Sequence, residues 1–502
     1  MNDKAVSLKQ KNFDENFIKK LADASISLAR QKGASYSDFR LSNFRSQRVS
    51  TREKVIQDIS DDENYGFSIR VLVDGAWGFA SSSTLSETEV LRITNLASEI
   101  SKANKIIQKR RVELVPVPSY VDEWKAPIKK NPFDVSVDEK VNFLFKINEK
   151  AKSLGANYCS SFMWAVNEWK YFASSAGSYI KQEMSRIWPG FDITIIDKEA
   201  GGFESRDSLT SPIGKGYEYI EEYDFMGDIE TAVEETKMKF KAKSVEPGKR
   251  DIILDPNNLW LTIHESCGHP TELDRALGFE ANYAGTSFMT TDKLGKLKYG
   301  SDIINLVADR TQKYGLATRG YDDDGVKTTK WDIIRNGMFV GYQTTREMAS
   351  YINEKESNGC AYSDNWSHFP IQRMPNVSLE PGKKKLSLND LIADTEDGIY
   401  IVGSGSWSID MQRYNFQFTG QAFHEVKNGK IVGLLKDVAY QGNTVDFWNS
   451  CDAICDESEY KLGGSFFCGK GEPSQSSPVS HGSSPARFRK VNILNTSKEV
   501  EG

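Results

Sequence analysis

The 502-residue chain carries 64 lysines and arginines against 70 aspartates and glutamates, a formal net charge of −6 at pH 7. Because the basic residues form no stripe or long run, this balance argues against a nucleic-acid-binding protein. The 39% hydrophobic and 11% aromatic content exclude a disordered chain and allow a substantial core.

The sequence also argues against a secreted or membrane protein. Residues 1–10 lack the apolar segment of a secretory signal, and no stretch approaches the ~20 apolar residues that a membrane span requires. Six cysteines at irregular spacing do not form a disulfide framework. We therefore expect a reduced, cytoplasmic location, where a cysteine is free to act as a thiolate ligand.

The N-terminal half is predicted to mix helices and strands. Asp74-Gly75 lies between two strand-like runs, which indicates a β-hairpin over residues 65–81. Ser86, followed three residues later by Glu89, opens a helix in capping-box order. Apolar periodicity predicts that this helix spans 86–108 and that further helices lie at 13–32, 137–153 and 228–243. Turn residues divide residues 156–207 into strands.

Residues 245–250 resemble a linker, so the predicted domains are 1–245 and 246–502. Beyond the linker we expect a short strand at 251–254, one helix, and then mostly strands and loops. The predicted fold class is α+β: an N-terminal α+β domain with an antiparallel sheet and helices, and a β-rich C-terminal domain that carries the one helix.

That helix holds the most informative residues of the chain. Asp255 is a suitable N-cap and Pro256 a suitable first helical residue. His264 and His269 lie on the last turn, with Glu265 beside the first histidine. The common zinc helix has two histidines at i and i+4 with a glutamate between them. A histidine pair with an adjacent glutamate therefore suggests a hydrolytic metal site, whereas a C-capping His269 and a core His264 would be the structural alternative.

The spacing of the two histidines is i, i+5. In a regular α-helix, five residues at 100° each place the two rings ~140° apart, too far to bind one ion. A widened turn of the π type would bring them together, and Gly268 would reduce its cost. We therefore predict a distorted last turn.

A catalytic zinc site needs a third protein ligand and an open position. Cys468 stands out among the candidates because it occupies a glycine-rich segment next to Lys470, where backbone amides and a cation would favour a thiolate. Cys267 is adjacent to a ligand and is expected to face the core. The candidates for the third ligand are His368, His424, His481, Cys451, Cys455 and Cys468.

These motifs resemble the TldD/PmbA family, and the TldD branch in particular. That family pairs a His-Glu-x-x-x-His helix, here His264 to His269, with a late Cys-Gly-Lys segment, here Cys468 to Lys470. The likeness also covers residues 66–81, 321–326, 373–377 and 405–407. Residues 471–482 depart from the family pattern, which suggests a distinct subgroup with its own substrate preference rather than a different metal site.

The resemblance implies a zinc peptidase with ligands His264, His269 and Cys468, and an enclosed site for short or unfolded peptides. Glu265 would act as general base on a metal-activated water. The resemblance further implies a homodimer, or a heterodimer with a PmbA/TldE-like subunit that lacks the metal motif.

Three other residues are candidates for substrate binding. His481 follows Cys468 closely and is a candidate for oxyanion stabilisation, although a solvated loop histidine is the favoured interpretation. Arg373 and Asn376 are candidates for contact with a substrate main chain or a neighbouring subunit, with a β-bend as the alternative.

The competing functional class is a non-catalytic, metal-stabilised regulatory partner of the gyrase-modulator type. A structural zinc site is closed by four ligands and needs no carboxylate beside them, so Glu265 favours the peptidase. A hydrolase acting on a non-peptide amide would use the same residues.

Overall fold

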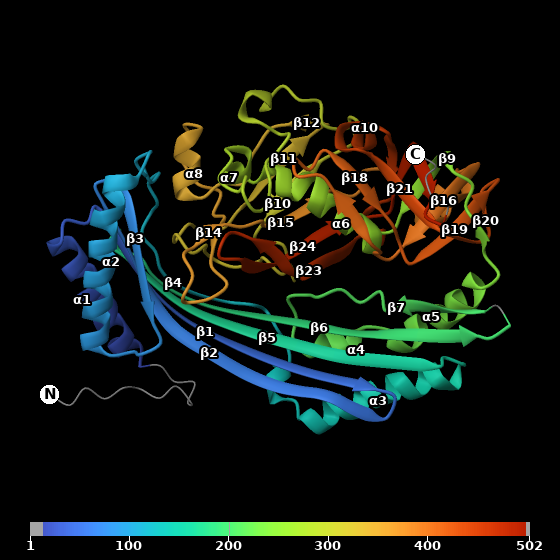
Figure 1. The fold of residues 1–502 in the computed structure, drawn as a ribbon, viewed down its shortest axis with the longest axis horizontal. Coiled ribbons are helices and arrows are strands. Elements are labelled where there is room, and N and C mark those ends of the chain that lie inside the picture. The colour runs from blue at the N-terminus through green and yellow to red at the C-terminus, as the bar shows by residue number, and fades with distance from the viewer. Residues whose placement is uncertain (1–13, 200, 498–502) are drawn as a thin grey trace.

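A long, curved sheet forms the base of the molecule in the computed structural model, which describes residues 14–199 and 201–497 (Figure 1). Its strand order is β3-β2-β1-β5-β6-β4, with β7 paired to β6, and every pair is antiparallel except β4 with β6. The strands are β1 (Tyr36–Arg52), β2 (Val55–Val73), β3 (Ala76–Ser82), β4 (Val121–Lys125), β5 (Tyr158–Ser174), β6 (Tyr179–Asp197) and β7 (Gly202–Asp207).

The predicted hairpin is confirmed as the β2–β3 connection. Val73 pairs with Ala76 across a two-residue turn. Asp74 and Gly75 both adopt positive φ, at 52° and 80°, as the turns that suit twisted hairpins require. The two-residue loop therefore fixes the strand register.

Helices cover the two ends of this sheet (Figure 1). One cluster packs α1 and α2 on β1–β3, and another packs α3 and α5 on β5 and β6. Ser86 caps α2 as predicted, accepting a hydrogen bond from the Glu89 amide. The helices are α1 (Glu15–Gln31), α2 (Glu87–Ile107), α3 (Val137–Ser153), α4 (Glu218–Glu222) and α5 (Phe225–Lys239). Residue 13, the expected start of the first helix, and residues 1–10, tested above for a signal, lie outside the described residues.

The C-terminal half is built on a second large sheet. Its order is β17-β18-β21-β25-β9-β16-β19-β20-β8, with β22 paired to β25. The strands are β8 (Lys243–Ser244), β9 (Gly248–Leu254), β16 (Asp397–Val402), β17 (Trp407–Ile409), β18 (Asn415–Phe418), β19 (Ala422–Lys427), β20 (Lys430–Lys436), β21 (Val438–Asn443), β22 (Cys451–Ile454) and β25 (Ala486–Asn495). The mixed helices and sheets confirm the α+β class.

Smaller sheets and short helices complete this half. The strands are β10 (Leu306–Asp309), β11 (Lys330–Arg335), β12 (Met338–Phe339), β13 (Ala361–Tyr362), β14 (Ile371–Gln372), β15 (Asn376–Leu379), β23 (Lys461–Lys470) and β24 (Gln475–Ser483). The helices are α6 (Pro256–Ile263), α7 (Leu273–Ala276), α8 (Arg346–Tyr351), α9 (Leu388–Ala393) and α10 (Thr444–Asn449).

Two sequence predictions for this region were wrong. The single expected helix is accompanied by α7 to α10, whose four to six residues are too short to give a periodic signal. Residues 248–250 of the supposed linker belong to β9, because their backbone pairs with β25. The division into two domains at residue 246 stays a prediction.

The β23–β24 hairpin lies between α6 and the concave face of the N-terminal sheet (Figure 1). Trp164 of β5 and Trp188 of β6 contact Phe466 and Phe467 of β23, with ring centroids 5.1–6.5 Å apart. The N-terminal sheet therefore supports the strand that carries Cys468. No helix within the described ranges is long and apolar enough to cross a membrane.

Candidate metal centre

Helix α6 begins as predicted. Asp255 caps it by accepting a hydrogen bond from the Asn257 amide at 2.9 Å, and Pro256 occupies the first turn. Tyr400 donates to the second oxygen of Asp255 at 2.7 Å. Leu259 and Ile263 are fully buried in the C-terminal core. This capped and packed helix gives the residues that follow it a rigid starting point.

The predicted distortion is confirmed, because α6 continues as a π-helical turn over His264–Gly268. The amide of His269 donates to the carbonyl of His264, an i→i+5 bond. The two imidazole centroids are consequently 4.5 Å apart, at an interplanar angle of 78°. A widened turn thus brings together two rings that a regular helix would separate.

Side chains from distant segments stabilise the π turn. Tyr299 donates to the carbonyl of Ser266 at 3.1 Å, Thr271 to that of Cys267 at 2.7 Å, and Gln343 to that of Gly268. Buried carbonyls that a widened turn displaces need such partners. Hydrogen bonds from the surrounding side chains therefore hold the π turn in place.

Gly268 serves the turn differently from our expectation. Its φ of −56° and ψ of −62° are ordinary helical values, so its conformational freedom is not needed. A Cβ at this position would instead lie 2.5 Å from the sulfur of Met374. Glycine is required here for space.

Cys468 completes a compact cluster with His264 and His269. One ligand atom from each residue lies within 4.8 Å of the others, and Cys468 Sγ is 3.7 Å from His269 Nε2. All three side chains are buried, each with 6% or less exposure. Two imidazoles and a thiol are the donor set that suits zinc.

His264 is fixed by a hydrogen-bond chain. His481 Nδ1 must donate to the carbonyl of Val377 at 2.7 Å, so its Nε2 accepts the Nδ1 proton of His264 at 2.7 Å. Burial lowers the pKa of both histidines, which favours these neutral forms. The remaining lone pair of His264 therefore lies on Nε2.

The sequence interpretation of His481 was wrong. Instead of lying in a solvated loop, His481 is fully buried in β24, with both ring nitrogens occupied. Its contact with the cluster is the hydrogen bond that it accepts from His264.

His269 has a carboxylate partner. Its Nδ1 lies 2.9 Å from Glu272 Oε2, and Lys470 holds the other oxygen of Glu272 at 3.0 Å. Burial opposes ionisation of Glu272, but Lys470 and His269 outweigh it and hold its pKa well below the usual range. A charged Glu272 accepts from His269 Nδ1 and leaves Nε2 facing Cys468. Sequence analysis missed Glu272, although its position three residues after His269 was a usable signal.

The environment of Cys468 differs in detail from the prediction. The residue lies in strand β23 beside a register shift, and Lys470 binds Glu272 and Asp274 rather than the thiol. Burial opposes its ionisation, yet His269 and Arg373 lower the thiol pKa below its ordinary value. The neighbours that favour the thiolate are therefore His269 and Arg373, not Lys470.

Arg373 and Asn376, the candidates for contact with a substrate main chain or a neighbouring subunit, bind the protein's own backbone. Both are fully buried. Arg373 donates to the carbonyls of Cys468 and Gln475. Asn376 accepts from the amide of Ser480, next to His481, at 3.2 Å. They position the two strands that carry Cys468 and His481.

Glu265 lies beside the cluster and forms an ion pair with Arg413. Arg413 sits in the turn between β17 and β18, with a φ of 66°. The side chain of Glu265 is 8% exposed and that of Arg413 17% exposed, so the protein shields most of this ion pair from water. A charge-assisted hydrogen bond of this kind has a defined geometry. Sequence analysis gave no signal for Arg413, which lies 148 residues away.

The remaining candidate ligands lie outside the cluster. His368 pairs with Asp364 and His424 with Glu235. Cys451 and Cys455 are buried thiols whose pKa burial raises. All six cysteines are free, as expected for a chain without a disulfide framework.

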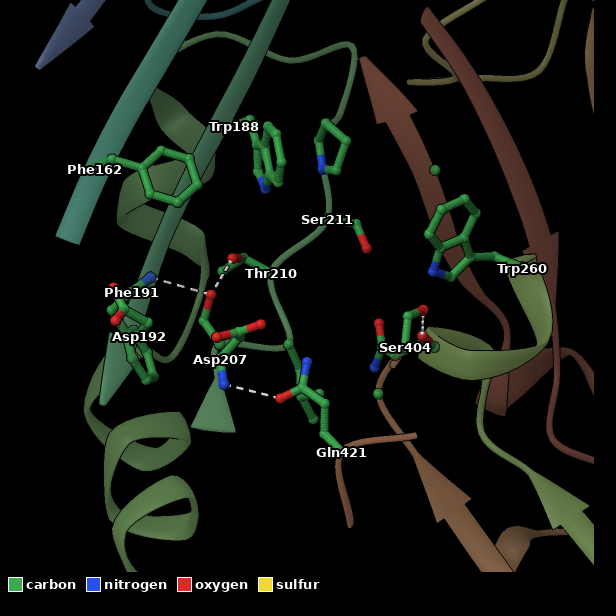
Figure 2. Close-up of a pocket in the computed structure, with 16 residues that line it drawn as sticks. Phe162, Trp188, Phe191, Asp192, Asp207, Thr210, Ser211, Trp260, Ser404 and Gln421 are labelled. Atoms are coloured by element: carbon green, nitrogen blue, oxygen red, sulfur yellow. Dashed lines mark hydrogen bonds between the residues drawn. The ribbon is translucent and has the colours of Figure 1, made fainter. Parts of the chain in front are cut away.

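A cavity of about 380 Å³ lies beside α6, between the N-terminal sheet and the C-terminal half. Figure 2 shows Phe162 and Trp188 on one wall, with Asp207 below them, and Trp260 on the opposite wall. Trp260 stacks on His481, with ring centroids 6.3 Å apart, and its ring lies 6.3 Å from that of His264. Trp260 is therefore the lining residue of this cavity that contacts the histidines.

Comparison with known proteins gives consistent matches along the chain. Profiles described as PmbA/TldA metallopeptidase domain 1, central domain and C-terminal domain match residues 37–104, 130–240 and 247–495. A metalloprotease of Methanocaldococcus jannaschii is 30% identical over 453 residues, which cover 89% of this chain and 94% of that protein. A zinc metalloprotease TldD homolog of Saccharolobus solfataricus is 25% identical, covering 93% of this chain and 98% of that protein.

The fold also matches a solved structure. TldE from Thermococcus kodakarensis superposes with a TM-score of 0.74 at 19% identity, covering 95% of this chain and all of that one.

Proposed function

Because the chain belongs to the PmbA/TldA metallopeptidase family and is a metallopeptidase, we propose that it hydrolyses peptide bonds with zinc bound by His264, His269 and Cys468. The main evidence for this proposal is that the ligand atoms of these three buried residues lie within 4.8 Å of one another. A zinc ion held by these three residues would keep a position for substrate or water, as catalytic zinc requires. The relative in Saccharolobus solfataricus, named a zinc metalloprotease, supports zinc as the metal.

Bound zinc would polarise the scissile carbonyl and lower the pKa of water. Glu265 is the general base in this proposal: it takes a proton from water and delivers it to the leaving amine. Arg413 holds the Glu265 carboxylate in one orientation through their ion pair. His481 and Glu272 keep the histidines in the tautomer that presents Nε2.

The substrates in this proposal are short or unfolded peptides, because the ligands are buried and only extended chains could reach them. The cavity beside Trp260 is one route to the cluster. Extended peptides also bind sheet edges through main-chain hydrogen bonds, with little side-chain specificity. An unfolded peptide mixture should be cleaved, and equally fast cleavage of a well-folded protein would contradict the proposal.

Metal removal is the direct test. Treatment with a zinc chelator is expected to abolish hydrolysis of an unfolded peptide mixture, and one equivalent of zinc per chain should restore it. Mass spectrometry of the untreated protein should find about one zinc per chain. Hydrolysis that survives complete removal of metal would refute the proposal.

A second test concerns the orienting histidine. His481→Phe removes the acceptor for His264 Nδ1 and should lower zinc affinity by about 10–100-fold, the usual effect of losing a partner of a metal ligand. Competition against a chromophoric chelator measures this affinity. His368→Phe, which changes a histidine outside the cluster, should leave it unchanged. Equal affinities in the two variants would exclude the orienting role.

The regulatory alternative is less well supported. A non-catalytic zinc site has no need for an adjacent carboxylate, whereas Glu265 directly follows the proposed ligand His264 and is held by Arg413. The match with TldE concerns the fold alone. We propose a cytoplasmic homodimer or a heterodimer with a TldE-like subunit, and light scattering after size exclusion would distinguish a dimer from a monomer.

A further inference from the structure

A second cavity, of about 310 Å³, is lined by Asp274, which binds Lys470. Helix α7 contributes Asp274, helix α8 contributes Glu347, and β14 contributes Gln372. Phe279, Met348 and Ile371 provide apolar walls. The cavity therefore combines carboxylates at some points with apolar surface at others.

The carboxylates around this cavity exceed its cations. Four carboxylates line it, from Asp274, Glu280, Asp324 and Glu347, against one guanidinium, from Arg70. Arg70 is already neutralised, because it lies 2.7 Å from both Asp38 and Asp324.

The remaining carboxylates lack full compensation. Asp274 shares Lys470 with Glu272. Glu280 accepts from the amide of Gly471 at 3.2 Å. Glu347 accepts from the indole of Trp77 at 3.0 Å and from the hydroxyl of Tyr351 at 3.2 Å. All three donors are neutral. Burial raises the pKa of Asp274 and of Glu347. A bound cation would stabilise this surplus of negative charge.

Gln372 provides an independent indication of a ligand. Its side chain is 3% exposed and lines the cavity, yet neither its amide nitrogen nor its amide oxygen has a hydrogen-bond partner within the described chain. Buried amides are almost always paired, because an unpaired one costs stability. A ligand with polar hydrogens in the cavity would satisfy the oxygen of this amide.

Two connections link the cavity to the cluster of His264, His269 and Cys468. Gly471, whose amide contacts Glu280, lies three residues after Cys468, about 10 Å along an extended chain. Asp274 connects to His269 through Lys470 and Glu272 by hydrogen bonds of 2.8–3.0 Å. An extended peptide at the cluster would place a side chain two or three residues away near this cavity.

We propose that this cavity is a subsite for a basic side chain of the peptide substrate, whose cationic group binds Glu347, Glu280 and Gln372. The apolar walls match the aliphatic stem of lysine or arginine, which buries its methylenes and directs only its head to polar partners. The assignment to a substrate rests on the proposed peptidase function, whereas binding of the cation itself does not.

Calorimetric titration of the full chain with Nα-acetyl-arginine methylamide tests the subsite. The citrulline analogue has nearly the same shape without the charge and should bind at least tenfold more weakly. Glu347→Gln keeps an acceptor for Trp77 and should lower the affinity for the arginine probe on the order of tenfold. Glu356→Gln removes the same charge from an exposed position and should change nothing.

Gln372→Leu distinguishes loss of cation binding from loss of folding. Because the native amide has no partner to lose, this variant should fold with an equal or higher Tm while binding the arginine probe more weakly. Equal binding of arginine and citrulline, or affinities unchanged by both cavity substitutions, would overturn the proposal.

Two further measurements show whether the bound cation is a side chain or a peptide N-terminus, and whether its binding depends on the metal. Norleucine methylamide carries only an α-ammonium, and binding equal to that of the arginine probe would assign the site to a peptide N-terminus instead. Binding should persist in chelator-treated protein. A protein that binds the arginine probe without cleaving any peptide would refute the proposed function and leave the cation site standing.

Discussion

Glu265→Gln is expected to keep about one zinc per chain and to lose peptide hydrolysis by about 10²–10⁴-fold, the usual contribution of a general base. Glutamine retains the shape of the side chain and an oxygen that accepts from Arg413, but it takes no proton from water. The ligands His264, His269 and Cys468 remain in place. Initial rates on an unfolded peptide mixture, paired with metal analysis of the same samples, measure both properties.

Glu356→Gln is the control, because it removes the same charge from an exposed residue outside the cluster. The comparison therefore separates the effect of the position of Glu265 from that of losing one negative charge. That control should hydrolyse peptides at the wild-type rate. If Glu265→Gln is as active as the control while retaining zinc, Glu265 is not the base. Loss of zinc in Glu265→Gln would instead assign the carboxylate to metal binding.

The helix that carries the cluster was predictable because its determinants are local. The cap at Asp255, the proline at 256 and the i, i+5 spacing of the histidines all lie within 15 residues. Since chelation by both rings is incompatible with a regular helix, the spacing itself predicted the π turn that the structure contains.

The residues that orient the ligands were not predictable in the same way. His481 lies 217 residues from His264 and contacts it only because β24 packs on α6. Arg373 reaches the carbonyl of Cys468 across 95 residues. Sequence analysis gave His481 as a candidate for oxyanion stabilisation or a solvated loop residue. It gave Arg373 as a candidate for contact with a substrate or a neighbouring subunit, with a β-bend as the alternative. Tertiary pairing, which no local pattern encodes, decided their roles.

Cys468→Ala is expected to lower zinc affinity by roughly a hundredfold or more, because loss of a direct ligand should exceed the 10–100-fold effect of losing its supporting partner. The thiolate also supplies the one formal negative charge among the three proposed ligands. Hydrolysis should fall with the bound metal. Zinc content by mass spectrometry and competition with a chromophoric chelator measure the loss.

Cys267→Ala is the matched control, since it removes a buried thiol from the π turn itself. Burial raises the pKa of Cys267, so this thiol stays neutral and is unsuited to bind a metal. The control should therefore retain zinc and activity even though its position is adjacent to the histidine ligands. If both variants lose zinc equally, the turn is merely fragile and Cys468 is not shown to be a ligand. If Cys468→Ala alone keeps its zinc, the third ligand must lie elsewhere and the proposed coordination is wrong.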